Sequence, residues 1–120
     1  MAKNSRFKQI VDEAKQKITE ISVEEALRRQ QQGAQLIDVR EAEDFAKEHA
    51  QGAVHLSRGT IELKIEELAP DTATPILCYC GGGSRSALAA ESLQRMGYTN
   101  VASVSGGFKA WKEQDLPTTS

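Results

Sequence analysis

One short segment of this sequence combines a nucleophile, three glycines and an arginine. Cys80 follows the apolar run Ile76–Tyr79, the glycines Gly81–Gly83 come next, and helix-forming residues occupy positions 87–96. This order predicts a strand, a tight loop and a helix. Because glycine has no Cβ, the loop can adopt positive φ values and turn its backbone amides inward around the thiol. Those amides and the positive end of the helix dipole would stabilise an anion, whether the Cys80 thiolate or a bound substrate.

An anion-stabilising loop would also make Cys80 a better nucleophile. The amides are expected to lower the pKa of the thiol, and Arg85 adds a fixed charge with a planar set of donors. A buried structural cysteine beside a sharp turn is the alternative, since free cysteine is often buried. That alternative does not explain Arg85, whose charge opposes the helix dipole unless a bound anion compensates for it. We therefore predict that Cys80 is catalytic. The expected substrate-binding residues of the loop are Gly81, Gly82, Gly83, Ser84, Arg85 and Ser86.

The length of the loop separates sulfur chemistry from phosphoryl chemistry. Four residues lie between Cys80 and Arg85, whereas protein tyrosine phosphatases and their dual-specificity relatives have five at this point. A loop that is one residue shorter encloses a smaller cavity, which suits a single sulfur atom better than a tetrahedral phosphoryl group. The pattern Cys-x-x-Gly-x-Arg, formed here by Cys80, Gly83 and Arg85, resembles that of the rhodanese sulfurtransferases.

Three further motifs extend this resemblance from about Ile21 to Pro117. Asp38-Val39-Arg40 is similar to the Asp-Val-Arg that ends an early strand in rhodaneses. His49-Ala50-Gln51-Gly52-Ala53 is similar to the family's His-Ile-Pro-Gly-Ala, with Ala-Gln in place of Ile-Pro. The segment Gly106–Trp111, followed by Leu-Pro, resembles the closing Gly-Gly-x-x-x-Trp. The motifs occur in the family's order and at its spacing.

The resemblance implies a single-domain rhodanese-like sulfurtransferase of the thiosulfate sulfurtransferase type. The Cys80 thiolate would attack the outer sulfur of a donor such as thiosulfate, and the resulting persulfide would pass its sulfur to a thiophilic acceptor. That acceptor would be cyanide in an assay or a thiol in a cell, a protein thiol included. No metal or organic cofactor is needed. The resemblance also implies that Arg58 lies beside the pocket mouth and attracts an anionic donor; an ordinary surface arginine is the alternative.

Two other functions stay open at this point. A non-catalytic rhodanese-like module would carry sulfur or bind a partner, although degenerate modules usually lose the cysteine that this chain keeps. A cysteine-dependent phosphatase or arsenate reductase would use Cys80 as well, and the short loop argues against it. Zinc binding by His49, His55, Cys78 and Cys80 is disfavoured, because the Cys-x-Cys spacing is tighter than in usual zinc knuckles. The resemblance favours a structural role for Asp38 and leaves that of Arg40 open.

Helical and extended patterns alternate along the chain, which predicts an α/β fold with a mostly parallel central sheet covered by helices on both faces. The expected strands are 34–39, 53–56, 76–79 and 101–104, and the expected helices are 22–32, 41–48, 61–68, 84–96 and 107–114. An amphipathic helix from about Asn4 to Thr19 precedes them. We divide the chain into a helical extension, 1–20, and a rhodanese-like domain, 21–120. Packing against the domain is the favoured role of the extension, over binding to a partner or a membrane surface.

Composition sets consistent bounds on the class of protein. With 120 residues the chain is of single-domain size. A net charge of −2 and few aromatic residues give no support to nucleic-acid binding. Two cysteines do not make a disulfide framework, no apolar run reaches the length of a membrane span, and residues 1–11 lack a signal-peptide core. These observations predict a cytoplasmic protein.

Overall fold

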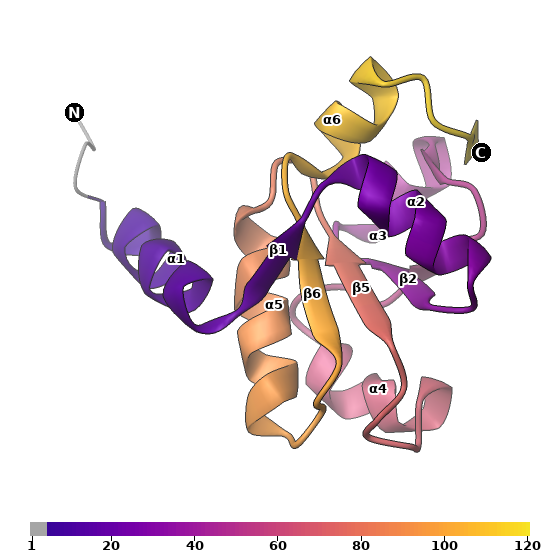
Figure 1. Cartoon of the computed structure of the whole chain (residues 1–120). Helices are drawn as coiled ribbons and strands as arrows, with labels where there is room; N and C mark the ends of the chain where they lie inside the picture. The colour runs from indigo at the N-terminus through magenta and orange to yellow at the C-terminus, as the bar shows by residue number, and fades with distance from the viewer. Residues whose placement is uncertain (1–4) are drawn as a thin grey trace.

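A five-stranded parallel sheet forms the centre of the computed structural model, which describes residues 5–120. Its order is β1-β6-β5-β2-β4, and every neighbouring pair is parallel. The strands are β1 (Thr19–Ile21), β2 (Gln35–Asp38), β4 (Val54–His55), β5 (Ile76–Tyr79) and β6 (Val101–Val104). The middle strand, β5, is buried along its whole length. Figure 1 shows β5 between β6 and β2.

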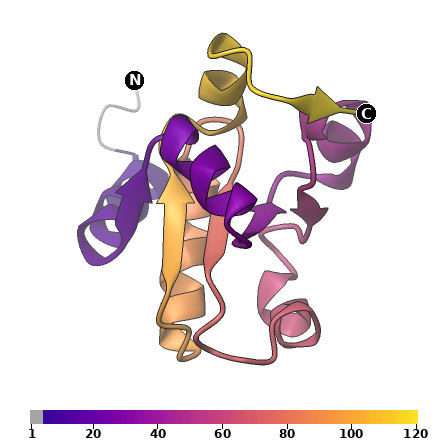
Figure 2. The ribbon, with the colours of Figure 1, turned by 45° about the vertical axis from the view of Figure 1, so that its right-hand side comes forward.

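Helices cover both faces of this sheet. They are α1 (Arg6–Lys17), α2 (Val23–Gln31), α3 (Ala42–Lys47), α4 (Ile61–Leu68), α5 (Ser84–Arg95) and α6 (Gly107–Glu113). One apolar cluster joins α4 and α5 to Ile76, Cys78 and Cys80, and a second joins α2 and α6 to Leu77 and Tyr79. Successive residues of β5 therefore face opposite layers, as strand geometry requires. Figures 1 and 2 show α2 and α5 on opposite sides of the sheet. The predicted α/β architecture is confirmed.

The N-terminal helix packs on the domain, but it is shorter than the sequence pattern suggested. Ser5 caps α1 by accepting a hydrogen bond from the Lys8 amide at 3.0 Å, and Asn4 lies outside the described residues. The helix ends at Lys17, and Thr19, expected to be helical, begins β1 beside β6. β-branched residues at 18, 19 and 21 favour this extended segment. The predicted boundary between residues 20 and 21 thus falls inside a strand of the sheet.

Contacts between α1 and α5 fix the extension against one edge of the sheet. The side chains of Val11 and Ala14 are buried, and Lys17 pairs with Glu91 of α5 at 3.4 Å. Figure 1 shows α1 beside α5, outside the layer that α2 forms. None of the helices within residues 5–120 is long and apolar enough to span a bilayer.

Two very short strands lie apart from the central sheet. β3 (His49–Ala50) pairs antiparallel with β7 (Thr118–Thr119). The pairing joins the turn that follows α3 to the C-terminal segment after α6. Neither strand was expected, because two-residue strands are too short to produce an alternating pattern in the sequence.

Candidate active site

Cys80 lies where β5 meets α5, at the carboxyl end of the central strand. In open parallel sheets this edge is where ligands bind. Gly83 caps α5 with φ +108°, a left-handed conformation that glycine adopts without strain. The loop of residues 81–83 can therefore reverse direction within three residues. The predicted strand, tight loop and helix are all present.

The sulfur of Cys80 accepts hydrogen bonds from this loop. The amides of Gly83 and Ser86 lie 3.1 and 3.4 Å from Sγ, and the Ser86 hydroxyl lies 3.5 Å from it. Burial raises the pKa of the Cys80 thiol, but the Ser86 hydroxyl and the amides of Ser86, Gly83 and Gly82 outweigh burial and leave the pKa below its ordinary value. Hydrogen bonds to the ionised form act in this direction. The loop therefore stabilises a thiolate.

The thiol is enclosed as well as hydrogen-bonded. Cys80 is only 1% exposed, whereas Gly82 at the tip of the loop faces solvent. A surface cavity of about 350 Å³ is lined by Arg28, Pro75 and Asn100, at the amino ends of the strands and thus opposite to Cys80. None of the residues of the Cys80 loop lines this cavity.

The first residues of α6 hold the loop from the other side. The amides of Phe108 and Lys109 donate hydrogen bonds to the carbonyl oxygens of Cys80 and Gly81, at 2.7 and 3.1 Å. A Cβ at Gly107 would lie 2.4 Å from the Cys80 oxygen, so only glycine permits this approach. Gly106-Gly107 could be recognised in the sequence as part of a family motif, but the role of these glycines could not be predicted from it. In the structure Gly107 lies in close contact with the backbone of Cys80 and Gly81.

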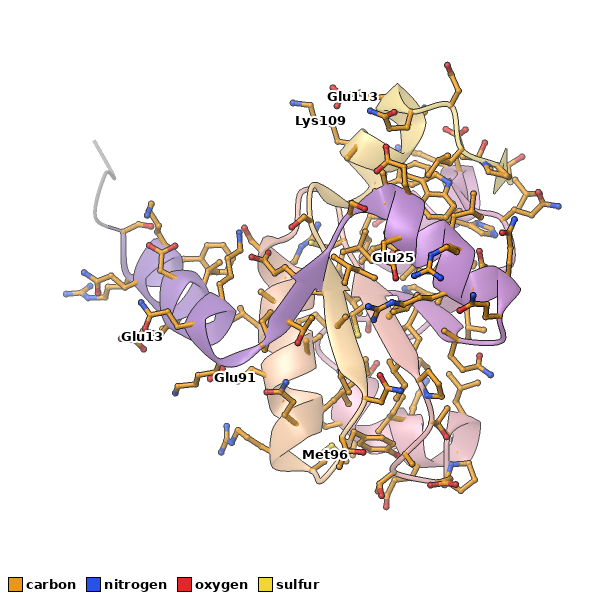
Figure 3. All side chains as sticks on the ribbon, in the orientation of Figure 1. Glu13, Glu25, Glu91, Met96, Lys109 and Glu113 are labelled. Carbon is orange, nitrogen blue, oxygen red and sulfur yellow. The ribbon has the colours of Figure 1, made fainter. Side chains whose placement is uncertain are left out.

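Arg85 extends over the loop without an ion-pair partner among residues 5–120. Its Nη2 would lie 3.8 Å from a Cβ at Gly81, and the side chain is half-buried. Lys109 adds a second charge beside the loop, with its side chain directed into solvent (Figure 3). Positive charge without a local acidic partner can attract an anionic ligand.

Arg58 is engaged elsewhere. Its guanidinium donates to Glu62 on α4 at 2.9 Å and approaches the Ser92 hydroxyl on α5 at 3.5 Å. Ser92 lies six residues after Ser86 on α5. The two contacts therefore hold the Arg58 guanidinium between α4 and this later part of α5. No hydrogen bond or ion pair within residues 5–120 joins the Arg58 side chain to the Cys80 loop. Its binding of a donor stays a prediction.

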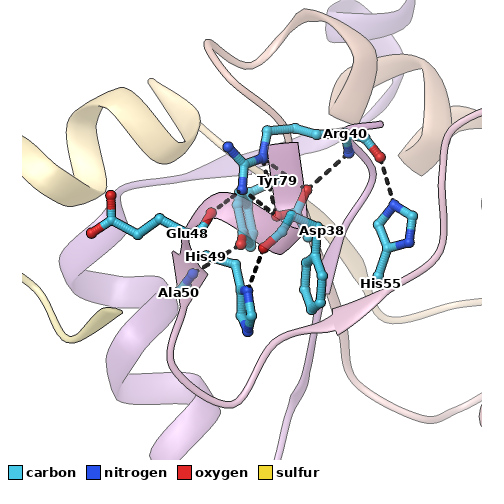
Figure 4. Close-up of polar contacts among 8 residues, drawn as sticks. Asp38, Arg40, Glu48, His49, Ala50, His55 and Tyr79 are labelled. Carbon is cyan, nitrogen blue, oxygen red and sulfur yellow. Dashed lines mark hydrogen bonds and ion pairs between the residues drawn. The ribbon is translucent and has the colours of Figure 1, made fainter. Parts of the chain in front are cut away.

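A buried ion pair braces the neighbouring strand end (Figure 4). Asp38 is fully buried and accepts hydrogen bonds from the Arg40 amide, Nε and Nη2 at 2.8–3.1 Å. Arg40 also donates to the Glu48 carbonyl oxygen at 2.7 Å, and its guanidinium lies 4.4 Å from the centre of the Phe108 ring. Both side chains thus support the segment that holds the loop, and neither contacts Sγ.

The two histidines have structural contacts. His49 Nδ1 donates to the Phe45 carbonyl oxygen at 2.7 Å and its ring stacks on Phe45, while His55 Nε2 donates to the Arg40 carbonyl oxygen at 2.7 Å (Figure 4).

Burial raises the pKa of Cys78 to about 12, so that thiol stays protonated. Within residues 5–120 no three histidine, cysteine or acidic side chains converge as metal ligands would.

The fold and the loop together define a thiolate site at the end of a parallel sheet. The chain belongs to the family of rhodanese-like domains, whose model matches residues 22–114. The match covers the loop, the Asp38–Arg40 pair and the Gly106-Gly107 motif. The suspected resemblance to single-domain rhodanese-like proteins is confirmed.

Solved structures from three bacteria are similar to this chain. One is a protein of unknown function from Rhodopseudomonas palustris, described as a possible tyrosine phosphatase, with 27% identity, TM-score 0.87 and coverage of 99% of this chain and 98% of that one. A homodimeric polysulfide-sulfur transferase from Wolinella succinogenes has 27% identity, TM-score 0.81 and coverage of 97% and 88%. A thiosulfate sulfurtransferase from Pseudomonas aeruginosa shares the fold at 24% identity and TM-score 0.78, with coverage of 89% of this chain and 21% of its own.

Proposed function

We propose that this protein transfers sulfane sulfur through a persulfide on Cys80. The observation that carries the proposal is the pair of hydrogen bonds that the backbone amides of Gly83 and Ser86 donate to Sγ. A thiolate held in this way needs no general base, because no proton has to leave during the attack. The Cys80 side chain is almost fully buried, which favours transfer of a small group such as one sulfur atom. The likeness to a polysulfide-sulfur transferase over 97% of the chain also supports this chemistry.

The reaction has two balanced steps. In the first, the Cys80 thiolate attacks the outer sulfur of a donor such as thiosulfate; the new S–S bond forms as the donor's S–S bond breaks, and sulfite leaves with the electron pair. In the second, a thiophilic acceptor attacks the outer sulfur of the persulfide. With cyanide the products are thiocyanate and the original thiolate. The loop amides are positioned to stabilise the terminal sulfur, and Arg85 to orient an anionic donor.

Intact-mass measurement tests the proposal. The protein would be incubated with thiosulfate or with polysulfide, freed of excess donor and weighed before and after addition of cyanide. We expect a gain of one sulfur atom that cyanide removes as thiocyanate. Cys80→Ser should gain no sulfur, and Cys78→Ala should still gain it. A Cys80→Ser protein that gains and releases sulfur as the wild type does would overturn the proposal.

A phosphatase activity is the second candidate, because the Rhodopseudomonas palustris structure is described as a possible tyrosine phosphatase. A transferring phosphoryl group spreads charge over three equatorial oxygens, and all of them need donors. The loop between Cys80 and Arg85 has one residue fewer than phosphatases use, so it offers fewer amides to those oxygens. Turnover of an aryl phosphate that depends on Cys80 and exceeds sulfur transfer would favour this candidate instead.

A further inference from the structure

We propose that Ser103 is a positioning residue for Cys80 and acts on the sulfur through the Ser86 hydroxyl. The inference rests on the proposed function in so far as Cys80 is taken to be the reacting group. Ser103 belongs to β6, and its side chain forms no hydrogen bond with the loop backbone among the described residues. Its effect would be transmitted by a chain of two hydroxyl groups.

The position of Ser103 is unusual for a polar residue. β6 is buried at all four positions, and Ser103 is 0% exposed. It pairs in register with Cys78 of β5, and so faces the same layer as Cys78 and Cys80. The other residues packed in this layer are predominantly apolar. A buried hydroxyl is costly unless it has a hydrogen-bond partner.

That partner is Ser86, in the first turn of α5. The two Oγ atoms are 2.8 Å apart, and Ser86 is also 0% exposed. Ser86 Oγ in turn lies 3.5 Å from the Cys80 sulfur. Two fully buried hydroxyl groups therefore link β6 to the nucleophile, and the Ser103 hydroxyl has no other side-chain hydrogen bond within residues 5–120.

Each hydroxyl has one hydrogen to donate and can accept as well. When Cys80 is a thiol, its S–H can donate to Ser86 and the Ser86 O–H to Ser103. When Cys80 is a thiolate, both O–H bonds rotate, so that Ser103 donates to Ser86 and Ser86 donates to the sulfur. The heavy atoms stay in place in both states. Donation from Ser103 polarises the Ser86 hydroxyl and strengthens its bond to the anion, since hydrogen bonds in a chain reinforce each other.

The experiment compares Ser103→Thr with Ser103→Val. Threonine keeps the hydroxyl, whereas valine has nearly the same shape without it, so both variants carry a similar packing cost. The measurement is the rate of Cys80 alkylation by iodoacetamide against pH, in a Cys78→Ala background. We expect the inflection for Ser103→Val to lie about half a unit above that for Ser103→Thr, which is about a threefold loss of thiolate below the inflection. Equal inflections would overturn the proposal.

Two further variants keep the test decisive if the larger side chains prevent folding. Ser103→Ala removes the hydroxyl without adding bulk and should raise the inflection relative to the protein that carries Cys78→Ala alone; an unchanged inflection would again overturn the proposal. In a Ser86→Ala background, Ser103→Ala should have no further effect, because the link is already broken. An equal shift in both backgrounds would show that Ser103 does not act through Ser86.

The charged and titratable groups around the loop stay constant in these variants. They are the Asp38–Arg40 pair at the end of β2, Arg58 after β4, Cys78 and Tyr79 on β5, Arg85 on α5 and Lys109 on α6; Cys78 is replaced in every protein compared. Alkylation does not require sulfur transfer. A shifted inflection in a protein that never acquires sulfur would therefore refute the proposed function and leave the role of Ser103 intact.

Discussion

The backbone amide of Phe108 donates a hydrogen bond to the carbonyl oxygen of Cys80 at 2.7 Å. The next amide, that of Lys109, does the same for Gly81 at 3.1 Å. In a trans peptide the C=O and N–H groups point in opposite directions, because the unit is planar. A Gly81 carbonyl held by α6 therefore turns the Gly82 amide away from α6, and that amide helps to lower the pKa of Cys80. The start of α6 thus orients the amides that stabilise the thiolate.

Gly107→Ala should disrupt this arrangement. A Cβ at this position would lie 2.4 Å from the Cys80 oxygen and 2.8 Å from the Gly81 carbonyl carbon, and both are backbone atoms that cannot move without distorting the loop. We expect loss of sulfur transfer and a large fall in the free energy of unfolding, measured with urea.

Gly33→Ala is the matched control. Gly33 also has a positive φ, +108°, but a Cβ there would meet nothing within 4 Å. It should cost only the left-handed strain, about 1 kcal/mol, and keep activity. Gly107→Ala should cost at least about 1–3 kcal/mol more, the usual range for overpacking. Equal costs for the two variants would mean that the contact with Cys80 is unimportant.

Local patterns predicted the strand, loop and helix around Cys80 correctly, because a strand, three glycines and a helix start are contiguous in the sequence. The strands β5 and β6 were predicted with their observed bounds, because each is a short contiguous stretch of the sequence. The partners of the loop were harder to predict. Ser103 and Phe108 reach it only through the pairing of β6 with β5 and the docking of α6, and no local pattern encodes those contacts.

Short elements were missed for a different reason. β1, β3 and β7 contain three, two and two residues, so their sequences carry no alternation. Thr19 follows an amphipathic helix directly, and only its pairing with Ala102 of β6 makes it part of a strand. The Asp38–Arg40 pair could be recognised from a family motif, but its contact with the Phe108 ring depends on tertiary packing.

Cys80 should ionise below the ordinary range of a thiol. Burial raises its pKa, yet the hydrogen bonds from Ser86, Gly83 and Gly82 outweigh burial. The rate of alkylation in a Cys78→Ala protein should therefore reach its plateau with an inflection below about 8.5, the value of a free cysteine. The same protein unfolded in urea provides the reference. An inflection at or above that of the unfolded chain would contradict the stabilising role of the loop.

Cys78 should affect stability at alkaline pH and leave sulfur transfer largely intact. Burial raises its pKa to about 12 in the folded state, whereas an unfolded thiol ionises near about 8.5. The stability that this protonated thiol contributes is complete below about 8.5 and is lost as pH rises toward 12. Cys78→Ala should cost about 1 kcal/mol at neutral pH and lose less stability than the wild type between about pH 9 and 11. Parallel pH profiles for the two proteins would refute this expectation.

Asp38→Asn should destabilise the protein strongly. Asp38 is fully buried and its carboxylate is matched to Arg40, so neutralising one partner leaves the other charge buried and unpaired. Changes of this kind cost about 3–5 kcal/mol. Asp12→Asn, which breaks the exposed pair between Lys8 and Asp12, should cost less than about 1 kcal/mol. Urea unfolding at neutral pH measures both, and similar losses would indicate that burial of the Asp38 pair contributes little.

A one-residue insertion between Gly83 and Ser84 tests loop length as the determinant of the reaction. It moves Arg85 to the sixth position after Cys80, the spacing found in phosphatases. The Gly83 amide, 3.1 Å from Sγ, lies before the insertion and can stay in place. The Ser86 amide and hydroxyl lie after it and are displaced from the sulfur. We expect the variant to lose sulfur transfer, because the thiolate loses half of its hydrogen-bonding partners or more.

The wider loop should in turn accommodate the three equatorial oxygens of a phosphoryl group. We therefore expect weak hydrolysis of an aryl phosphate by the insertion variant and negligible hydrolysis by the wild type, each measured beside thiocyanate formation from thiosulfate and cyanide. A circular dichroism melt shows whether the variant is folded, and insertion of one residue after Asp71, in the exposed turn before β5, controls for chain length. If the wild type proves the better phosphatase of the two, loop length does not select the reaction, and the phosphatase becomes the favoured function.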